Sequence, residues 1–80
     1  MGIMEELADE LAKEVVEAAE RLGDLDLAKK VGQVIGSSST TTEEAFLTAV
    51  RYRTALHRGR LFLHERLKNA AEGAEGDSEE

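Results

Sequence analysis

Apolar residues recur at steps of three and four over the first part of the chain. The members of this series are Met4, Leu7, Ala8, Leu11, Val15, Ala18, Ala19 and Leu22. A repeat of this period places the apolar side chains on one face of an α-helix. Gly23 follows the series, and glycine is the residue that most often ends a helix in the left-handed conformation. The pattern predicts a helix over about residues 3–22.

A second, shorter apolar segment begins soon after Gly23. Its apolar positions are Leu27, Ala28, Val31, Val34 and Ile35. Asp24 belongs to the residue types that cap the start of a helix, and Gly36 can end one. The pattern predicts a second helix over about residues 25–35, joined to the first by a short reversal as in an αα-hairpin.

The longest helical segment runs from Thr42 to about Ala71, after a polar linker of serines and threonines. Thr41 and Glu44 have the spacing of a capping box, so Thr41 is expected to cap this helix. A helix over residues 42–71 would be about 45 Å long at 1.5 Å per residue. A chain of 80 residues leaves too few others to cover both sides of such a helix. We therefore expect part of it to pack against another molecule.

The long helix carries its own apolar stripe, again at steps of three and four. The predicted interface between chains consists of Ala45, Ala49, Tyr52, Leu56, Gly59, Leu63 and Leu67, and the series continues to Ala70. Its small residues let a partner backbone come close. Further apolar residues beside the stripe are Phe46, Val50, Ala55 and Phe62. They give the helix a wider apolar face than a two-stranded seam needs, which is typical of a helix that touches two neighbours in a bundle.

Composition supports an all-α fold. The chain has no cysteine or proline, few aromatic residues, and abundant Leu, Ala, Glu, Arg and Lys, which are good helix formers. The expected architecture is a helical hairpin plus one long C-terminal helix, assembling as a dimeric helical bundle. Residues 1–71 form the single predicted domain. The Gly- and acid-rich residues 72–80 are expected to be a disordered acidic tail.

Charge is distributed unevenly along this chain, whose net charge is −7. Acidic residues gather in the first helix and the tail, whereas the long helix is basic. A row of basic residues beside the apolar stripe consists of Arg53, His57, Arg60, His64 and Lys68. Like charges at this spacing repel one another, so acidic groups are expected against them. The row pairs either with the acidic first helix, of the same or a second chain, or with an anion such as a phosphate or a nucleic-acid backbone.

Nothing in the sequence predicts an enzyme, a cofactor or a metal site. There is no phosphate-binding loop, and there is no nucleophile with a base and an orienting acid. His57 and His64 are seven residues apart, which is about 10 Å along a helix. Two histidines at that distance on one helix cannot share a zinc ion.

Two pairs of residues on the long helix have a spacing known from one class of enzymes. Arg51 and His57, and again Arg58 and His64, are six residues apart. This spacing resembles the Arg-to-His motif of the HEPN class of helical ribonucleases. The resemblance implies an all-α dimer that cleaves RNA in a cleft between its subunits. An aromatic residue and a glycine follow the two arginines, where those enzymes carry a polar residue.

The expected function is that of a small non-enzymatic module for protein–protein interaction or regulation, which self-associates through the long helix. A second copy is the expected partner, in a homodimer or a larger assembly, and a different protein is the alternative. The acidic balance argues against nucleic acid as a partner. No apolar run reaches the length of a membrane span, and the N-terminus is acidic where a secretion signal is basic. We therefore expect a cytoplasmic protein that does not contact membranes.

Overall fold

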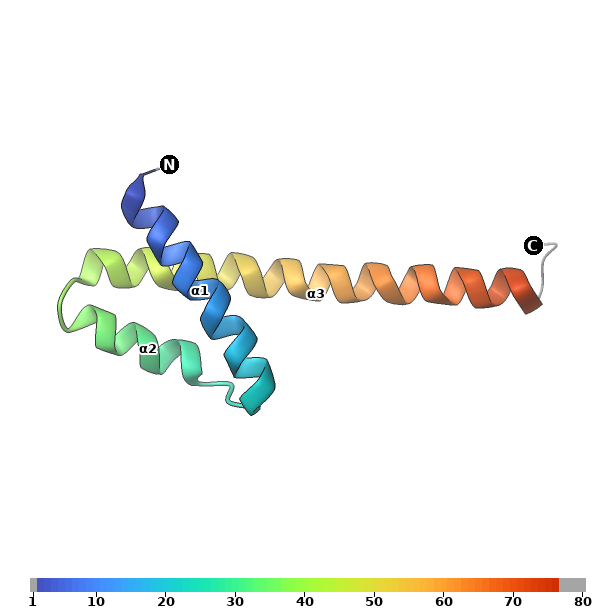
Figure 1. The fold of residues 1–80 in the computed structure, drawn as a ribbon, viewed down its shortest axis with the longest axis horizontal. Coiled ribbons are helices and arrows are strands. Elements are labelled where there is room, and N and C mark those ends of the chain that lie inside the picture. The colour runs from blue at the N-terminus through green and yellow to red at the C-terminus, as the bar shows by residue number, and fades with distance from the viewer. Residues whose placement is uncertain (1, 77–80) are drawn as a thin grey trace.

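Three α-helices make up the fold (Figure 1). The structure, a computed structural model, describes residues 2–76. The helices are α1 (Ile3–Leu22), α2 (Leu27–Gly36) and α3 (Thr40–Gly76). No strand occurs in this part of the chain, which confirms the predicted all-α class.

α1 spans the residues expected for it and ends at Gly23. This glycine has φ 67° and ψ 27°, a left-handed conformation that glycine adopts without the steric cost other residues incur. The amide of Asp24 then donates to the carbonyl of Ala19 at 3.1 Å, which is the hydrogen bond of a Schellman ending. The glycine therefore lets the chain leave the helix and turn back toward α2.

α2 begins at Leu27, two residues later than expected, because Asp24 stabilises a turn instead of capping the helix directly. Its Oδ1 accepts a hydrogen bond from the amide of Asp26 at 3.0 Å, and its Oδ2 accepts one from Lys30 Nζ at 3.2 Å. An aspartate that bonds the amide two residues further on forms an Asx-turn. Residues 24–26 are therefore the connection between the two helices.

α3 is capped by Ser39, and the prediction of Thr41 as the cap is wrong. The Oγ of Ser39 accepts a hydrogen bond from the amide of Thr42 at 3.1 Å and lies 2.8 Å from the Thr42 hydroxyl. A cap residue must reach an amide in the first helical turn. Ser39 does so because the helix begins at Thr40, and Thr41 then lies within that first turn.

The other end of α3 also lies beyond its expected position. The helix continues past Ala71 to Gly76. Alanine and glutamate, which favour helix, separate the glycines in this stretch. The first part of the tail expected over residues 72–80 is therefore helical, and residues 77–80 lie outside the described residues.

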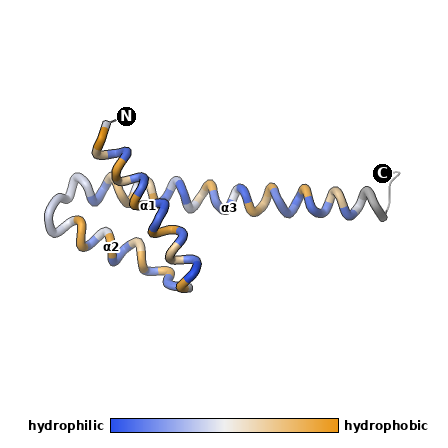
Figure 2. The backbone as a smooth tube through the Cα atoms, viewed as in Figure 1, coloured by the Kyte–Doolittle hydropathy of each residue, from blue (hydrophilic) through white to orange (hydrophobic). Residues whose placement is uncertain are grey.

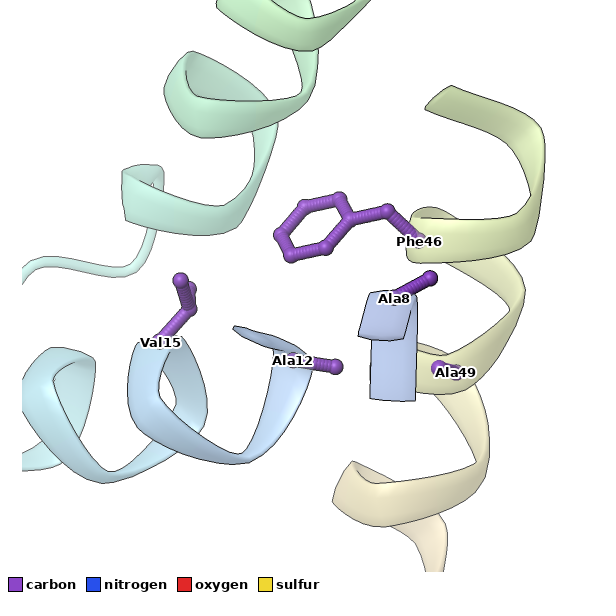
Figure 3. Close-up of a cluster of buried hydrophobic side chains, with 5 residues drawn as sticks. All are labelled: Ala8, Ala12, Val15, Phe46 and Ala49. Atoms are coloured by element: carbon purple, nitrogen blue, oxygen red, sulfur yellow. The ribbon is translucent and has the colours of Figure 1, made fainter. Parts of the chain in front are cut away.

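The first half of α3 holds the other two helices (Figure 1). α1 crosses it and α2 lies along its N-terminal end, so that each helix contacts both of the others. The buried core lies between these helices (Figure 3) and consists of Ala8, Ala12, Val15, Phe46 and Ala49. Phe46 is its one large, fully buried side chain. The alanines around it let α1 and α3 approach closely.

The second half of α3 extends beyond this bundle as a single helix. Every residue from Arg58 to Gly73 is exposed, and we call residues 58–76 the overhang. The chain measures 60 × 29 × 13 Å and has a radius of gyration of 17.6 Å. A compact chain of this length would have a radius of gyration of about 11.6 Å. Hydrophobic positions nevertheless continue along the overhang (Figure 2).

Replacing Phe46 by Ala should remove most of the stability of the fold. Loss of a buried phenylalanine side chain costs about 3–5 kcal/mol, and no second large side chain is fully buried in this core. The matched control is Phe62→Ala on the overhang, where the ring is 62% exposed and a much smaller loss is expected. Urea denaturation followed by circular dichroism compares the free energies of unfolding. Equal losses in the two variants would show that Phe46 is not the centre of the core.

Candidate functional site

The apolar stripe of α3 is divided between two environments. At its N-terminal end, Ala49 is buried in the core and Ala45 packs against that core, so α1 covers this part within one chain. The large residues further along are exposed by 52–67%, and they are Tyr52, Leu56, Leu63 and Leu67. Gly59 lies between them, and a Cβ added there would meet no atom within 4 Å. From Tyr52 onward the stripe is therefore open to a partner.

The overhang lacks the packing that ordinarily stabilises a helix. A helix shorter than about 12–15 residues is marginal in water, and most helices in proteins are held by packing of an apolar face. Gly59 adds a cost of about 1 kcal/mol relative to alanine in a helix interior. An exposed helix with a glycine near its base and a row of leucines along one side is the expected form of a segment that packs against a second molecule.

Two further large apolar residues lie on other sides of the overhang. Leu61 and Phe62 are both more than half exposed. The guanidinium carbon of Arg66 lies 5.8 Å from the centre of the Phe62 ring, within the range of a cation–π contact. The Phe62 ring therefore has a polar neighbour within its own helix, whereas the leucines of the stripe have no such cover.

A groove between α1 and α3 runs into the stripe. It is lined on the α1 side by Met4, Glu5 and Asp9, and on the α3 side by residues that include Ala45, Ala49 and Tyr52. The groove is lined mainly by apolar surface, and the carboxylates of Glu5 and Asp9 lie on its α1 side. Such a groove can accept an apolar side chain that carries a basic neighbour. No sequence pattern predicts this groove, because it depends on where α1 crosses α3.

The basic row beside the stripe begins with an ion pair to α1. Nε and Nη2 of Arg53 donate to Oδ1 and Oδ2 of Asp9, each at 2.7 Å. Two parallel charge-assisted hydrogen bonds of this kind fix both the distance and the orientation of the partners. The hydrogen bonds from Arg53 lower the pKa of Asp9, and those to Asp9 raise the pKa of Arg53. This pair therefore ties the N-terminal half of α1 to α3.

His57, the next member of the row, contacts Glu20 near the other end of α1. The remaining members, Arg60, His64 and Lys68, are exposed on the overhang, and no carboxylate of the described residues lies within 4 Å of their charged atoms. The first two members of the row pair with α1, and we call them its proximal half. The last three members lie on the overhang, and we call them its distal half. Sequence reasoning anticipated an acidic first helix against this row, but nothing in the spacing identified Asp9 and Glu20 as its contacts.

The Arg–His pairs that resemble the HEPN motif do not share one face of α3. Six residues on an α-helix correspond to about 600°, so that the two side chains of a pair lie about 120° apart around the axis. Arg51 and Arg58 are exposed, whereas His57 is partly covered by α1. The contact that His57 makes is with Glu20. Within one chain, the pairs do not converge on a common cleft.

Comparison of the chain with protein-family models, with curated proteins and with solved structures finds no match. The site is therefore interpreted from its own geometry. No helix in the described part of the chain combines the length and the apolar character needed to cross a membrane. Over the same residues, His, Asp and Glu side chains do not gather in groups of three that could hold a metal ion.

The pKa of Asp9 provides a test of the pair with Arg53. Because hydrogen bonds from Arg53 lower this pKa in the folded chain, Asp9 stabilises the fold above the pKa of an unfolded aspartate, about 3.9. That contribution is lost as the pH falls through the lower folded value. Arg53→Gln should return the pKa of Asp9 toward its ordinary value in a carboxyl NMR titration, and stability should then fall less steeply in this acidic range.

The matched control for this titration is Lys30→Gln. Lys30 makes the equivalent contact with Asp24, and its hydrogen bond is the main cause of the lowered pKa of that aspartate. This variant should raise the pKa of Asp24 and leave Asp9 unchanged. An Asp9 pKa that is the same with and without Arg53 would mean that the pair does not form in solution.

Proposed function

We propose that this chain is a small, non-enzymatic protein–protein interaction module that self-associates through α3. The observation that carries the proposal is the exposed stripe of α3, in which Leu56, Leu63 and Leu67 lie on one side of the helix and are each more than half exposed. Apolar surface gathered in this way is typical of an interaction site. The three-helix bundle then serves as the support that positions the overhang.

The surface area of the chain supports association. Its accessible surface is 6206 Å², whereas a compact monomer of this mass would expose about 4,700 Å². The difference is about 1,500 Å², and a stable interface removes about 800 Å² from each partner. The chain therefore exposes enough surface beyond that of a compact monomer to form such an interface.

The charges support a second copy as the partner. The chain carries a basic row on α3 and an acidic α1, and among residues 2–76 the ion pairs of the row involve its Arg53 and His57 end. A second copy offers an apolar stripe that can pack against this one, and an acidic α1 whose carboxylates can approach His64 and Lys68. Complementary charge steers association and selects the partner. Each chain thus carries the apolar, basic and acidic groups that a contact between two copies requires.

Leu63→Asp should convert the wild-type oligomer into a monomer, because the interface would have to bury a carboxylate without a partner. The measurement is sedimentation equilibrium over a concentration series. The matched control is Leu61→Asp. Both leucines are 52% exposed, but they lie about 200° apart around the helix, so the control should retain the oligomer.

Two outcomes of this experiment would contradict the proposal. A wild-type chain that remains a monomer at every concentration would show that the stripe does not serve self-association, and would direct the search to a different protein. Equal dissociation of both aspartate variants would show that the interface is not confined to the stripe.

Binding of an anion by the distal half of the basic row is the second candidate. It is favoured by the exposure of Arg60, His64 and Lys68 beside one another on the overhang. Arg53 and His57 already contact carboxylates, which confines this function to the three distal residues. An anion held mainly by charge binds more weakly as salt rises.

Fluorescence anisotropy with a labelled single-stranded oligonucleotide tests the anion-binding candidate. If it is correct, Arg60→Ala with Lys68→Ala should abolish binding, and rising salt should weaken it in the wild-type chain. Arg58→Ala with Arg66→Ala removes the same charge from another side of α3 and should change binding much less. Equal effects of the two double variants would indicate attraction to net charge alone, without a site.

A further inference from the structure

The stripe of α3 has the same spacing when it is followed in either direction from its centre. Counting outward from the peptide bond between Gly59 and Arg60, the first large residues of the stripe are Leu56 and Leu63, at equal distances on the two sides. The next are Tyr52 and Leu67, again equidistant, and then Ala49 and Ala70. A stripe with this symmetry can be laid against an inverted copy of itself so that its large apolar residues meet one another, while Gly59 and Arg60 lie next to the centre.

We propose that two copies of α3 pair in antiparallel orientation, with the two-fold axis beside Gly59. This inference rests on the proposed self-association and specifies its geometry. Leu56 of each copy faces Leu63 of the other, and Tyr52 faces Leu67. Gly59 lies next to the axis, where the space left by its missing Cβ lets the two helices come close.

The groove between α1 and α3 favours this orientation over a parallel one. In the antiparallel pair, the overhang of one copy lies along the N-terminal half of the other copy's α3, where that groove opens beside Ala49 and Tyr52. Leu67 and Ala70 of the overhang then reach the level of the groove. A parallel pair would place overhang against overhang and leave both grooves uncovered.

Charge favours the same orientation. When two helices pair antiparallel, each flank of one helix meets the same flank of the other. The flank of the overhang that carries His64 and Lys68 therefore meets the side on which the second copy's α1 presents Glu5, next to an Asp9 that is already paired with Arg53 of its own chain. In a parallel pair this flank would meet the opposite one, which carries Arg51 and Arg66. Like charges across a contact are unfavourable.

Arg60 is the one member of the row that lies near its own symmetry copy in this arrangement. Within its own chain Arg60 lines a hollow beside α1, together with the carboxylates of Glu17 and Glu20 and the basic residues Lys13, Arg53 and His57. Repulsion between the two guanidinium groups is reduced when each lies in its own hollow, away from the axis. Antiparallel pairing therefore adds carboxylates beside His64 and Lys68, whereas those near Arg60 belong to its own chain.

Crosslinking of single-cysteine variants tests the orientation, and the chain contains no cysteine of its own. Tyr52→Cys and Leu67→Cys are prepared separately, mixed, refolded together and treated with a short bis-maleimide. Both positions are exposed in the single chain, so neither substitution disturbs the core. In the antiparallel pair, the cysteine at position 52 of one copy faces the cysteine at position 67 of the other. Two cysteines at the same position, one in each copy, would be about 22 Å apart along the helix axis. The expected product is the mixed dimer, identified by its intact mass.

The control replaces Leu67→Cys with Glu65→Cys, which lies two residues away on another side of the same helix. It should give little mixed product with Tyr52→Cys. Crosslinking of each single variant to itself would demonstrate a parallel pair and overturn the inference, while self-association would stand. A dimer in sedimentation that gives no crosslink above the Glu65→Cys control would also overturn it. A monomer in sedimentation would refute the proposed self-association itself.

Discussion

The length of α3 is the constraint on which the rest of the structure depends. A helix of 37 residues extends about 55 Å, whereas helices of 20 and 10 residues extend about 30 and 15 Å. The two shorter helices cross or follow only the first half of α3, so the second half has no cover within the chain. The bundle, the exposed stripe and the divided basic row all follow from this mismatch in length.

The core of one chain is small for the same reason. Its five buried residues include three alanines, and Phe46 alone contributes a large, fully buried side chain. Small domains bury a limited share of their surface and are marginally stable. Association that buries the overhang would add to the stability of the folded chain, because a partner that binds only the folded form shifts the folding equilibrium toward it. Folding and self-association are therefore expected to be coupled in this protein.

The sequence predicts those features of the fold that depend on neighbouring residues. The apolar period and Gly23 were sufficient for α1, because both act within one or two helical turns. The residue that caps α3 could not be selected from the sequence, because several serines and threonines in a row offer competing caps. Ser39 is the one that reaches the amide of Thr42. The α1–α3 groove and the contacts of Asp9 and Glu20 could not be predicted, because they depend on the point and angle at which α1 crosses α3.

The basic row shows how one local pattern can acquire two roles from its surroundings. Its members share a helix face and basic side chains, yet Arg53 is held by two hydrogen bonds to Asp9, while His64 and Lys68 are exposed on the overhang. The first role ties α1 to α3 beside the groove that opens next to the stripe. The second leaves basic side chains on the segment that would lie along that groove in another copy. The same row therefore makes contacts within the chain at one end and is exposed for contacts between chains at the other.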